Sequence, residues 1–475
     1  MFHSSLKGRH DHLQFKFLKI LLLLKIWIAF YSSLVSSKSN TIPNEILSNQ
    51  IDSSHNLNLD NWIHFQANKS WQAVLVNISP PSALPGLVVA SLSTSKPDYF
   101  YSWTRDTAIV LKEIVYRYSE TNDSNLLQII KNSISSTQLI QKNSLHAPGN
   151  LGEPKYYVNG SAFNGPWGRP QRDGPALRAT VYMNFAKAYL KSGGQEAQNY
   201  VNQILYDGIW QSRSVIKADL EYISNTWKEN SFDLWEEVNG IHFFTLSVIQ
   251  RALKDGAEFS HNLKDFGAAN WYQKQAQEID DQLKLFWDKK AGYLKTTIKS
   301  LDSHGKTSGL DVGTILACLH AGNSASSEFG LGSPKMVQTF QAILKSMAAL
   351  YPLNSRYAHL NAKATGRYPE DIYDGVGTSI GNPWFLTTLA MSEFIYRSLN
   401  LNNKLNISEN DSTKILDRKL ADQFLIIIKS VANRNGSLHE QMDRVTGFGK
   451  GARDLTWSHV AFLSMYRARN GQKEF

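Results

Sequence analysis

The chain has 475 residues, of which 42% are hydrophobic and 19% charged, so it carries enough apolar surface for a folded core and is neither disordered nor fibrous. Lysine and arginine number 50 against 41 aspartates and glutamates, a net charge of +9. Because no arginine-rich stripe accompanies this modest excess, the composition does not indicate a nucleic-acid-binding protein.

The first 60 residues are predicted to lie outside the folded domain. Residues 15–35 form an apolar run with basic flanks, and small residues follow at 35–37, which is typical of a secretory signal comprising residues 1–37. Lys25 interrupts the run, whose length approaches that of a membrane span, so an uncleaved signal anchor is the alternative. Residues 38–60 are polar and predict a flexible segment.

Seven N-x-S/T triplets also fit passage through the secretory pathway. We therefore expect a protein that is secreted or kept in a vacuole, the endoplasmic reticulum or a spore compartment, without membrane attachment once the signal is cleaved.

Residues 61–475 are predicted to form one domain, since no linker or charge block divides them. Apolar residues recur there at helical spacing, as in Met336, Phe340, Ile343, Leu344 and Met347. Such stretches fall at 71–78, 107–118, 126–140, 177–191, 199–211, 215–227, 242–253, 270–287, 336–350, 383–399, 416–431 and 455–467. The best strand candidate is 293–298. An all-α fold of paired helices closed into a toroid is expected, with an irregular helical bundle as the alternative.

Metal and nucleotide sites are not indicated. The single cysteine, Cys318, excludes an intrachain disulfide and a cysteine-rich metal site. None of the 13 histidines stands in an H-x-x-x-H pattern, and the chain has no phosphate-binding loop of the G-x-x-x-x-G-K-S/T kind. We therefore expect no metal and no cofactor.

Five segments combine acids, arginines and tryptophans without helical amphipathicity. They are 98–106 (DYFYSWTRD), 165–178 (GPWGRPQRDGPALR), 232–240 (FDLWEEVNG), 366–386 (GRYPEDIYDGVGTSIGNPWFL) and 438–458 (LHEQMDRVTGFGKGARDLTWS). Polar groups packed among tryptophans are costly unless a ligand or a network uses them. Sugars suit this mixture, because their CH faces stack on aromatic rings while carboxylates and guanidinium groups bond vicinal hydroxyls.

The five segments, in this order, resemble those of the glucoamylases, glycoside hydrolase family 15, in particular the yeast-type and sporulation-associated ones, and the resemblance runs from about residue 71 to 467. It implies an (α/α)6 barrel with long active-site loops. It also implies exo-hydrolysis of α-1,4 bonds, and more slowly α-1,6 bonds, from the non-reducing ends of starch or glycogen, with release of β-D-glucose by inversion. The expected partner is an α-glucan substrate, and the protein is expected to be a monomer without a cofactor.

By this resemblance, Glu236 is the general acid and Glu440 the general base. A general acid needs a raised pKa, and the neighbouring Glu237 and Trp235 would raise the pKa of Glu236. Two adjacent acids such as Glu236 and Glu237 are, however, more often found in the first turn of a helix. An inverting site needs its two carboxyl groups about 6.5–9.5 Å apart. His439 stands where the family usually has Ser or Thr, and a histidine beside the base is expected to alter its pKa.

The resemblance also implies the substrate-binding residues, with Asp233 as a supporting carboxylate. They are Tyr99, Trp103, Arg105, Asp106, Trp167, Trp235, Glu237, Arg367, Tyr373 and Trp384. Arg105 with Asp106 could alternatively be a structural ion pair, and Trp384 a core aromatic. Bracing roles are expected for Arg169, Arg172, Asp173, Glu370 and Asp371.

Two rival functions are consistent with the same residues. One is another inverting glucosidase on this barrel, such as an α,α-trehalase or a glucodextranase. The other is a glucan-binding protein without activity, which the presence of both Glu236 and Glu440 disfavours. Only five residues follow Asn470, so no starch-binding domain is expected, and adsorption to raw starch granules should be poor.

Overall fold

The computed structural model describes residues 58–472, apart from 210–213, 302–305, 323–327 and 406–415. The predicted signal segment, 1–37, and nearly all of the polar segment 38–60 lie outside the described residues. Leu59 and Asp60, which we predicted to be flexible, already belong to the first described helix. That helix begins there because the Asn58 side chain caps it, accepting a hydrogen bond of 2.8 Å from the Asn61 amide.

Helices dominate the described part of the chain. They are α3 (Leu59–Val76), α4 (Thr104–Thr121), α5 (Ser124–Ser144), α6 (Asp173–Ser192), α7 (Gly194–Tyr200), α8 (Val215–Thr226), α9 (Phe243–Asn262), α10 (Phe266–Leu283), α11 (Gly313–Ala321), α12 (Pro334–Ala348), α13 (Phe385–Leu405), α14 (Arg418–Val431) and α15 (Thr456–Arg469). Short 3-10 turns lie at Asn150–Gly152, Lys284–Phe286 and Pro352–Tyr357, and a π turn lies at Val201–Leu205.

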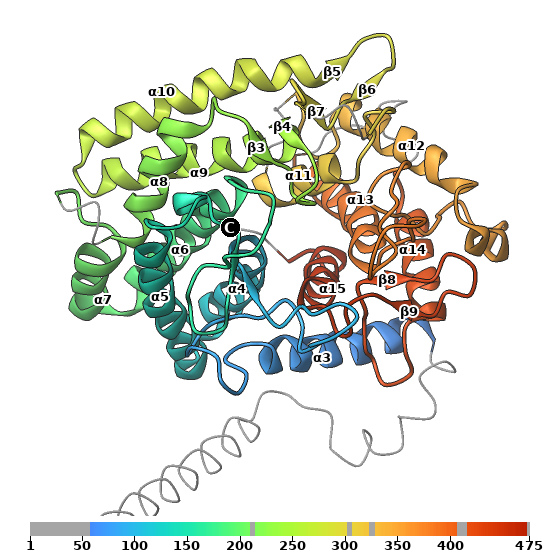
Figure 1. The fold of residues 1–475 in the computed structure, drawn as a ribbon, viewed down its shortest axis with the longest axis horizontal. Coiled ribbons are helices and arrows are strands. Elements are labelled where there is room, and N and C mark those ends of the chain that lie inside the picture. Colours follow the sequence, from blue (N-terminus) through green and yellow to red (C-terminus); the bar gives the residue numbers. More distant parts are fainter. Residues whose placement is uncertain (1–57, 210–213, 302–305, 323–327, 406–415, 473–475) are drawn as a thin grey trace, which may run out of the picture. The chain divides into compact units, whose positions relative to one another are not determined.

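Six of these helices form a closed inner ring. α4 packs against α6, and the contacts continue through α9, α11, α13 and α15, which returns to α4 (Figure 1). A second layer, made of α3, α5, α8, α10, α12 and α14, covers the outside, with each outer helix against an inner one. The predicted (α/α)6 barrel is thereby confirmed, and the irregular bundle is excluded.

The burial pattern of each helix follows its layer. Outer helix α14 buries one face, with Leu420, Phe424 and Ile428 at helical spacing, and Asp417 caps its start by accepting from the Leu420 amide at 2.6 Å. Inner helix α6 is buried along most of its length, because it faces both the barrel interior and the outer layer. The single cysteine, Cys318, is buried in inner helix α11, as expected of a small apolar group.

The strands are short and belong to the loops. They are β1 (Ser102–Trp103), β2 (Lys155–Tyr156), β3 (Ser231–Phe232), β4 (Asn239–His242), β5 (Trp287–Asp288), β6 (Tyr293–Leu294), β7 (Thr297–Ile298), β8 (Gln441–Met442) and β9 (Gly449–Lys450). The antiparallel pairs are β1–β2, β3–β4, β4–β7, β5–β6 and β8–β9. The predicted strand at 293–298 is thus two strands with different partners. The β3–β4 pair closes the turn at 233–238, and β8 follows Glu440 directly.

Several predicted helix boundaries were wrong: the helix expected at 242–253, for example, runs on to Asn262, and α11 was not among the predicted helices. The helix expected at 71–78 begins twelve residues earlier, at Leu59. The helix expected at 199–211 is replaced by α7 and the π turn, which ends at Leu205 because Tyr206 is extended. Apolar spacing marks a buried face but not the point at which the backbone leaves the helix.

Among the described residues, no helix is both long and apolar enough to pass through a bilayer.

Candidate active site

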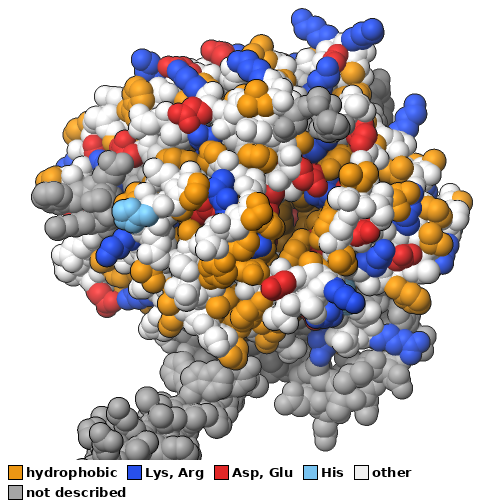
Figure 2. Space-filling view, viewed as in Figure 1, with side chains coloured by type: hydrophobic (Ala, Val, Ile, Leu, Met, Phe, Trp, Pro, Cys, Tyr) orange, Lys and Arg blue, Asp and Glu red, His pale blue; other side chains and the backbone are white. Residues whose placement is uncertain are grey.

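A cavity of about 390 Å³ opens at the N-terminal end of the inner helices (Figure 2). It is lined by Ala90, Tyr99, Trp103, Arg105, Asp106, Trp167, Gly168, Leu234, Trp235, Glu236, Glu237, Arg367, Tyr373, Trp384, Glu440, Leu455 and Trp457. Every proposed acid, base and substrate-binding residue of the sequence analysis is among them, and only the supporting Asp233 is not. The loops before the inner helices bring together side chains that are far apart in the sequence, such as Tyr99 and Glu440, which are separated by 341 positions.

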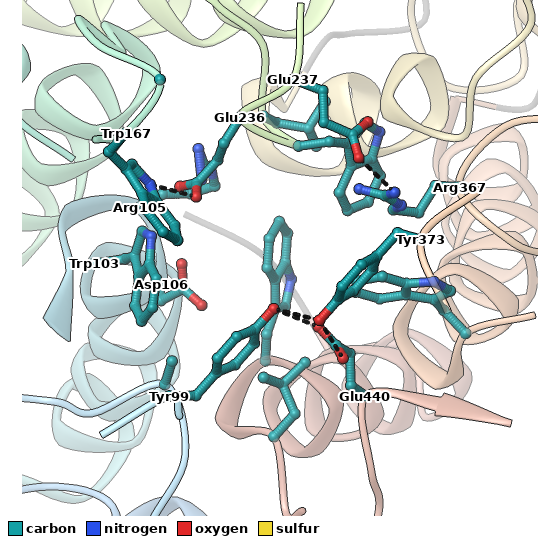
Figure 3. Close-up of a pocket in the computed structure, with 17 residues that line it drawn as sticks. Tyr99, Trp103, Arg105, Asp106, Trp167, Glu236, Glu237, Arg367, Tyr373 and Glu440 are labelled. Atoms are coloured by element: carbon teal, nitrogen blue, oxygen red, sulfur yellow. Dashed lines mark hydrogen bonds and ion pairs between the residues drawn. The ribbon is translucent and has the colours of Figure 1, made fainter. Parts of the chain in front are cut away.

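Glu236 reaches the cavity from the turn between β3 and β4 (Figure 3). Its backbone adopts a positive φ of 70°, and its amide bonds the Asp233 carbonyl at 2.9 Å. The Trp167 indole donates to its Oε2 at 2.7 Å, and Arg105 lies 3.5 Å from its Oε1. Burial raises the pKa of Glu236 to about 7, although Arg105 opposes the shift. The carboxyl group can therefore hold a proton near neutral pH.

Glu440 lies on the opposite side of the cavity, directly before β8. Tyr99 donates a hydrogen bond to its Oε1 at 2.9 Å, Tyr373 to its Oε2 at 3.4 Å, and the Ala452 amide to Oε2 at 3.3 Å. Burial raises the pKa of Glu440 to about 7, against the effect of these donors. Gly451 passes so close that an added Cβ would lie 2.1 Å from Glu440 Oε2.

Arg105 and Asp106 lie in the first turn of α4 and face the cavity. Arg105 donates to Asp173 Oδ2 at 2.7 Å and also bonds Gln171, so an internal ion pair fixes its guanidinium group. The partner of Arg105 is Asp173 rather than Asp106, so the expected alternative of an Arg105–Asp106 ion pair was wrong about the partner. Burial raises the pKa of Asp106 to about 6. Both residues present polar atoms to a ligand.

A second group of polar residues surrounds Glu237. Arg367 donates to Glu237 Oε1 at 2.6 Å and to both oxygens of Asp371, at 2.7 and 2.9 Å. The Tyr368 hydroxyl donates to Glu237 Oε2 at 2.6 Å. Burial raises the pKa of Glu237, while Arg367 lowers it. The expected bracing role of Asp371 agrees with these contacts, because it holds Arg367 and also accepts from the Tyr373 amide at 2.9 Å.

Aromatic rings form the rest of the wall. Trp235 lies 5.7 Å from Trp384 and 6.2 Å from Trp457, measured between ring centroids. On the other side, Trp103 lies 5.5 Å from Tyr99 and 6.0 Å from Trp167. Trp384 therefore lines the cavity rather than only the core. Such walls offer flat apolar faces beside fixed polar groups, which is the surface that a sugar ring requires.

The braces of the loop that carries Trp167 are also visible. Arg169 donates to Glu153 and to the carbonyls of Phe163 and Gly165, both at 3.1 Å. Arg172 bonds Glu229 and the Asn230 carbonyl. Elsewhere, Glu370 accepts from the Ser308 amide at 2.7 Å, and so fixes the segment after 305.

Sequence reasoning missed several lining residues. Trp457 stands in the fifth segment, but nothing in its spacing distinguished it from a core tryptophan. Ala90, Leu234 and Leu455 carry no chemical signal. Lys155, which does not line the cavity, was also missed: its ammonium group lies 3.7 Å from the centroid of the Trp167 ring, and burial lowers its pKa to about 8.

His439 does not face the cavity. His439 is not among the residues that line the cavity, and its ring packs against Gly449 while the Glu440 side chain packs against Gly451. Burial lowers the pKa of His439, with smaller effects from Asp454, His459 and Arg453. No direct contact between His439 and the Glu440 side chain therefore supports the expected effect of this histidine on the pKa of the base.

Across the described residues, no cluster of three or more His, Cys, Asp or Glu side chains is placed to hold a metal ion.

Comparison with known proteins matches residues 68–467 to the family model described as glycosyl hydrolases family 15. The chain is 36% identical over 446 residues to glucoamylase 1 of Rhizopus oryzae, covering 88% of this chain and 72% of that protein. It is 32% identical over 470 residues to the intracellular sporulation-specific glucoamylase of Saccharomyces cerevisiae, covering 86% and 84%. Among solved structures, the Saccharomycopsis fibuligera glucoamylase superposes with a TM-score of 0.75 at 30% identity, over 87% of this chain and 96% of that one.

Proposed function

This chain belongs to glycosyl hydrolase family 15, and we propose that it is a glucoamylase, a glucan 1,4-α-glucosidase that removes glucose from the non-reducing ends of starch or glycogen. The observation that supports this most directly is a cavity with two carboxyl groups on opposite sides, Glu440 buried and Glu236 partly buried, each with a pKa raised to about 7. General acid–base chemistry needs such a pair, one group protonated and the other ionised.

In this proposal, Glu236 is the general acid. Its desolvated carboxyl group keeps its proton until the glycosidic oxygen arrives, and donates it as the bond to C1 breaks. The Trp167 indole then stabilises the carboxylate that is left, because it already donates to Oε2. Arg105 lies near the other oxygen and has the same effect on the anion.

Glu440 is the general base. As a carboxylate, it accepts a proton from the water that attacks C1 from the face opposite the leaving group, and the product is β-D-glucose. The hydroxyls of Tyr99 and Tyr373 and the Ala452 amide fix its orientation. After the reaction Glu236 has lost a proton and Glu440 has gained one, and proton exchange with solvent restores both residues.

The polar side chains of the cavity bind the sugar hydroxyls. Arg105 and Asp106 hold the terminal glucose, while Glu237 and Arg367 hold hydroxyls near the scissile bond. The rings of Tyr99, Trp103, Trp167, Trp235, Tyr373 and Trp384 pack against the sugar faces. Trp457, in the first turn of inner helix α15, closes the pocket toward the barrel core, which favours attack at a chain end.

The test is an assay of purified protein with maltotriose, soluble starch and trehalose, in which NMR follows the anomer of the glucose released before it mutarotates. We expect β-glucose from the first two substrates, with slower cleavage of α-1,6 bonds. Early release of α-glucose would refute inversion, and hydrolysis of trehalose alone would identify the rival trehalase.

The cellular setting also belongs to the proposal. The signal-like residues 1–37 support entry into the secretory pathway, and the S. cerevisiae relative is described as intracellular and sporulation-specific. We propose that the enzyme acts as a monomer, either outside the cell or within a compartment of that pathway. Sequencing of the mature N-terminus and size-exclusion chromatography would test both statements.

A further inference from the structure

The turn that carries Glu236 is held from the side away from the cavity. Asp233 Oδ1 accepts from the amides of Glu237 at 2.8 Å and Val238 at 3.0 Å, and the Asp233 carbonyl accepts from the Glu236 amide at 2.9 Å. These bonds surround a glutamate at positive φ, a conformation that costs energy for any residue with a Cβ. The position of Glu236 therefore depends on Asp233.

Lys306 fixes Asp233 in turn. Its ammonium group donates to Asp233 Oδ2 and to Asp311 Oδ2, both at 2.6 Å, and lies 4.5 Å from the centre of the Tyr368 ring. The lysine side chain is 4% exposed and the two carboxylates 1% or less. Although burial opposes it, Lys306 holds the pKa of Asp233 below its usual range.

Asp311 extends the same network to the aromatic wall. It accepts from the Trp235 indole at 3.0 and 3.1 Å and from the Gly313 amide at the start of α11 at 2.6 Å. The ammonium group thus joins two carboxylates, one behind the acid's turn and one behind a wall tryptophan. Without it, the two would lie buried and unpaired.

We propose that Lys306 is a positioning residue for this active site, which sets the turn of Glu236 and Glu237 through Asp233 and the Trp235 ring through Asp311. The proposal rests on the proposed function, since its effect on turnover requires that Glu236 be the acid. A neutral side chain at 306 lets Asp233 rotate or take up a proton, and the amides of Glu237 and Val238 then lose their acceptor. Displacement of the acid by about 1 Å can cost 10²-fold in rate.

The experiment uses Lys306→Gln with Lys217→Gln as the matched control. Lys217 is also a buried lysine, 10% exposed, and it donates to Asp265 at 2.5 Å and to the Gly208 carbonyl at 2.9 Å, but it does not line the cavity. Both variants lose one buried cation, so both should unfold at lower temperature. Three quantities are measured below the unfolding range: kcat, KM for maltotriose, and hydrogen exchange of peptides that contain residues 233–240.

We expect Lys306→Gln to lower kcat at least ~10-fold, with a smaller change in KM, and to speed amide exchange at Glu237 and Val238. Lys217→Gln should leave kcat and the amide exchange at Glu237 and Val238 at their wild-type values. A folded Lys306→Gln protein with wild-type kcat and exchange would overturn the proposal. If the wild-type protein were inactive on maltotriose, the proposed function would be refuted. The hydrogen-exchange measurement would still test the positioning role of Lys306, because it is made without substrate.

A second variant covers the case in which Lys306→Gln does not fold. The double variant Lys306→Gln with Asp311→Asn removes one of the two unpaired charges, but still deprives Asp233 of its cation. Slow turnover and fast exchange at 233–240 in this variant would support positioning. Wild-type turnover and exchange would show that Lys306 merely neutralises charge, and would overturn the proposal.

Discussion

The two sides of the pocket each hold a catalytic carboxyl group with a raised pKa, but they surround it with different groups. Glu440 is buried and the Glu236 side chain is 16% exposed, and desolvation raises the pKa of each to about 7. Glu236 nevertheless contacts a guanidinium group and an indole, whereas Glu440 contacts two phenol hydroxyls and a backbone amide. The direct contacts of the acid include a charged group, whereas those of the base are neutral donors, and the charge of Arg367 acts on the base without direct contact.

This difference indicates how each side can be disturbed. Behind Glu236 lie the ion pairs of Arg105 with Asp173 and of Lys306 with Asp233, so loss of a charge should displace the acid. Behind Glu440 lies the backbone of Gly451, so added volume should displace the base. Electrostatic changes and steric changes are therefore expected to separate the two carboxyl groups experimentally.

The largest expected effect comes from neutralising either carboxyl group. Glu236→Gln and Glu440→Gln should each lower kcat on maltotriose at least ~10²-fold, because positioned acids and bases contribute about 10²–10⁴-fold. Glu258→Gln, an exposed change on α9, is the control and should keep wild-type kcat. Near-normal turnover by either variant would contradict its assignment.

The same variants can distinguish the acid from the base. In an aryl glucoside with an acidic phenol, the phenolate leaves without being protonated. Such a substrate should therefore restore much of the rate that Glu236→Gln loses on maltotriose, and little of the rate that Glu440→Gln loses. Steady-state rates on such a substrate and on maltotriose provide the comparison. Equal restoration in both variants would show that the two roles are not divided as proposed.

A smaller steric effect is expected from Gly451→Ala. Gly451 has a φ of 69°, and an added Cβ would meet Glu440 Oε2 at 2.1 Å, so the carboxylate must move. We expect a loss of kcat of at least ~10-fold, since a misplaced catalytic group can cost up to ~10²-fold, together with about 1–2 kcal/mol of stability lost to the positive φ.

Gly292→Ala is the matched control for this prediction. Gly292 has a φ of 77°, but an added Cβ would meet no atom within 4 Å. It should therefore lose similar stability, measured by thermal unfolding, and keep its kcat. If both variants lost activity equally, backbone strain rather than contact with Glu440 would be the cause.

The contrast between the two sides also shows what the sequence could predict. Helical spacing predicted most of the barrel helices, because each buries an apolar stripe at a fixed period. Glu236 and Glu440 were identified by their motifs and not by their surroundings. The contact of Glu440 with Tyr99 joins positions 341 apart, and that of Asp233 with Lys306 joins positions 73 apart.

No local pattern encodes such pairs, since the closure of the barrel creates them. Lys306 appears in the sequence as an ordinary lysine between Gly305 and Thr307. Its role depends on Asp233 and Asp311, which the loops bring to it from either side. The positive φ of Glu236 is hidden for the same reason, because it belongs to the turn that the pairing of β3 with β4 closes.

The pH dependence of kcat/KM should distinguish the two carboxyl groups more finely. The acid must be protonated, so activity falls as the pH rises through the pKa of Glu236. The indole of Trp167 lowers that pKa, so its removal in Trp167→Phe should move the alkaline limb to higher pH by about one to two units, given the ~1.5–3 kcal/mol of a hydrogen bond to a charged group. Movement of the acidic limb instead would show that Trp167 acts on the pKa of the base and not on that of the acid, and would contradict the proposed contact.

Tyr99→Phe should act on the opposite limb. The base must be ionised, so activity falls as the pH drops through the pKa of Glu440. The Tyr99 hydroxyl lowers this pKa, and its removal should raise the acidic limb by somewhat less than one unit, because Tyr373 and the Ala452 amide still donate. A profile of kcat/KM between pH 3 and 9 measures the shift, and an unchanged acidic limb would contradict the contact.

The smallest effect is expected from the residue that the sequence made most suspect. His439 is adjacent to Glu440, and a charged histidine beside the base would be expected to lower its pKa. In the structure, His439 packs on Gly449, whereas Glu440 packs on Gly451, and Asp454, His459 and Arg453 are the titratable groups that influence His439. We therefore expect His439→Ser to move the acidic limb of kcat/KM by less than about 0.3 unit, well below the Tyr99→Phe shift, since a charge without direct contact is weakened by distance and screening. A shift as large as that of Tyr99→Phe would mean that the imidazole reaches Glu440 after all, and that the side of the base, like that of the acid, is controlled by charge.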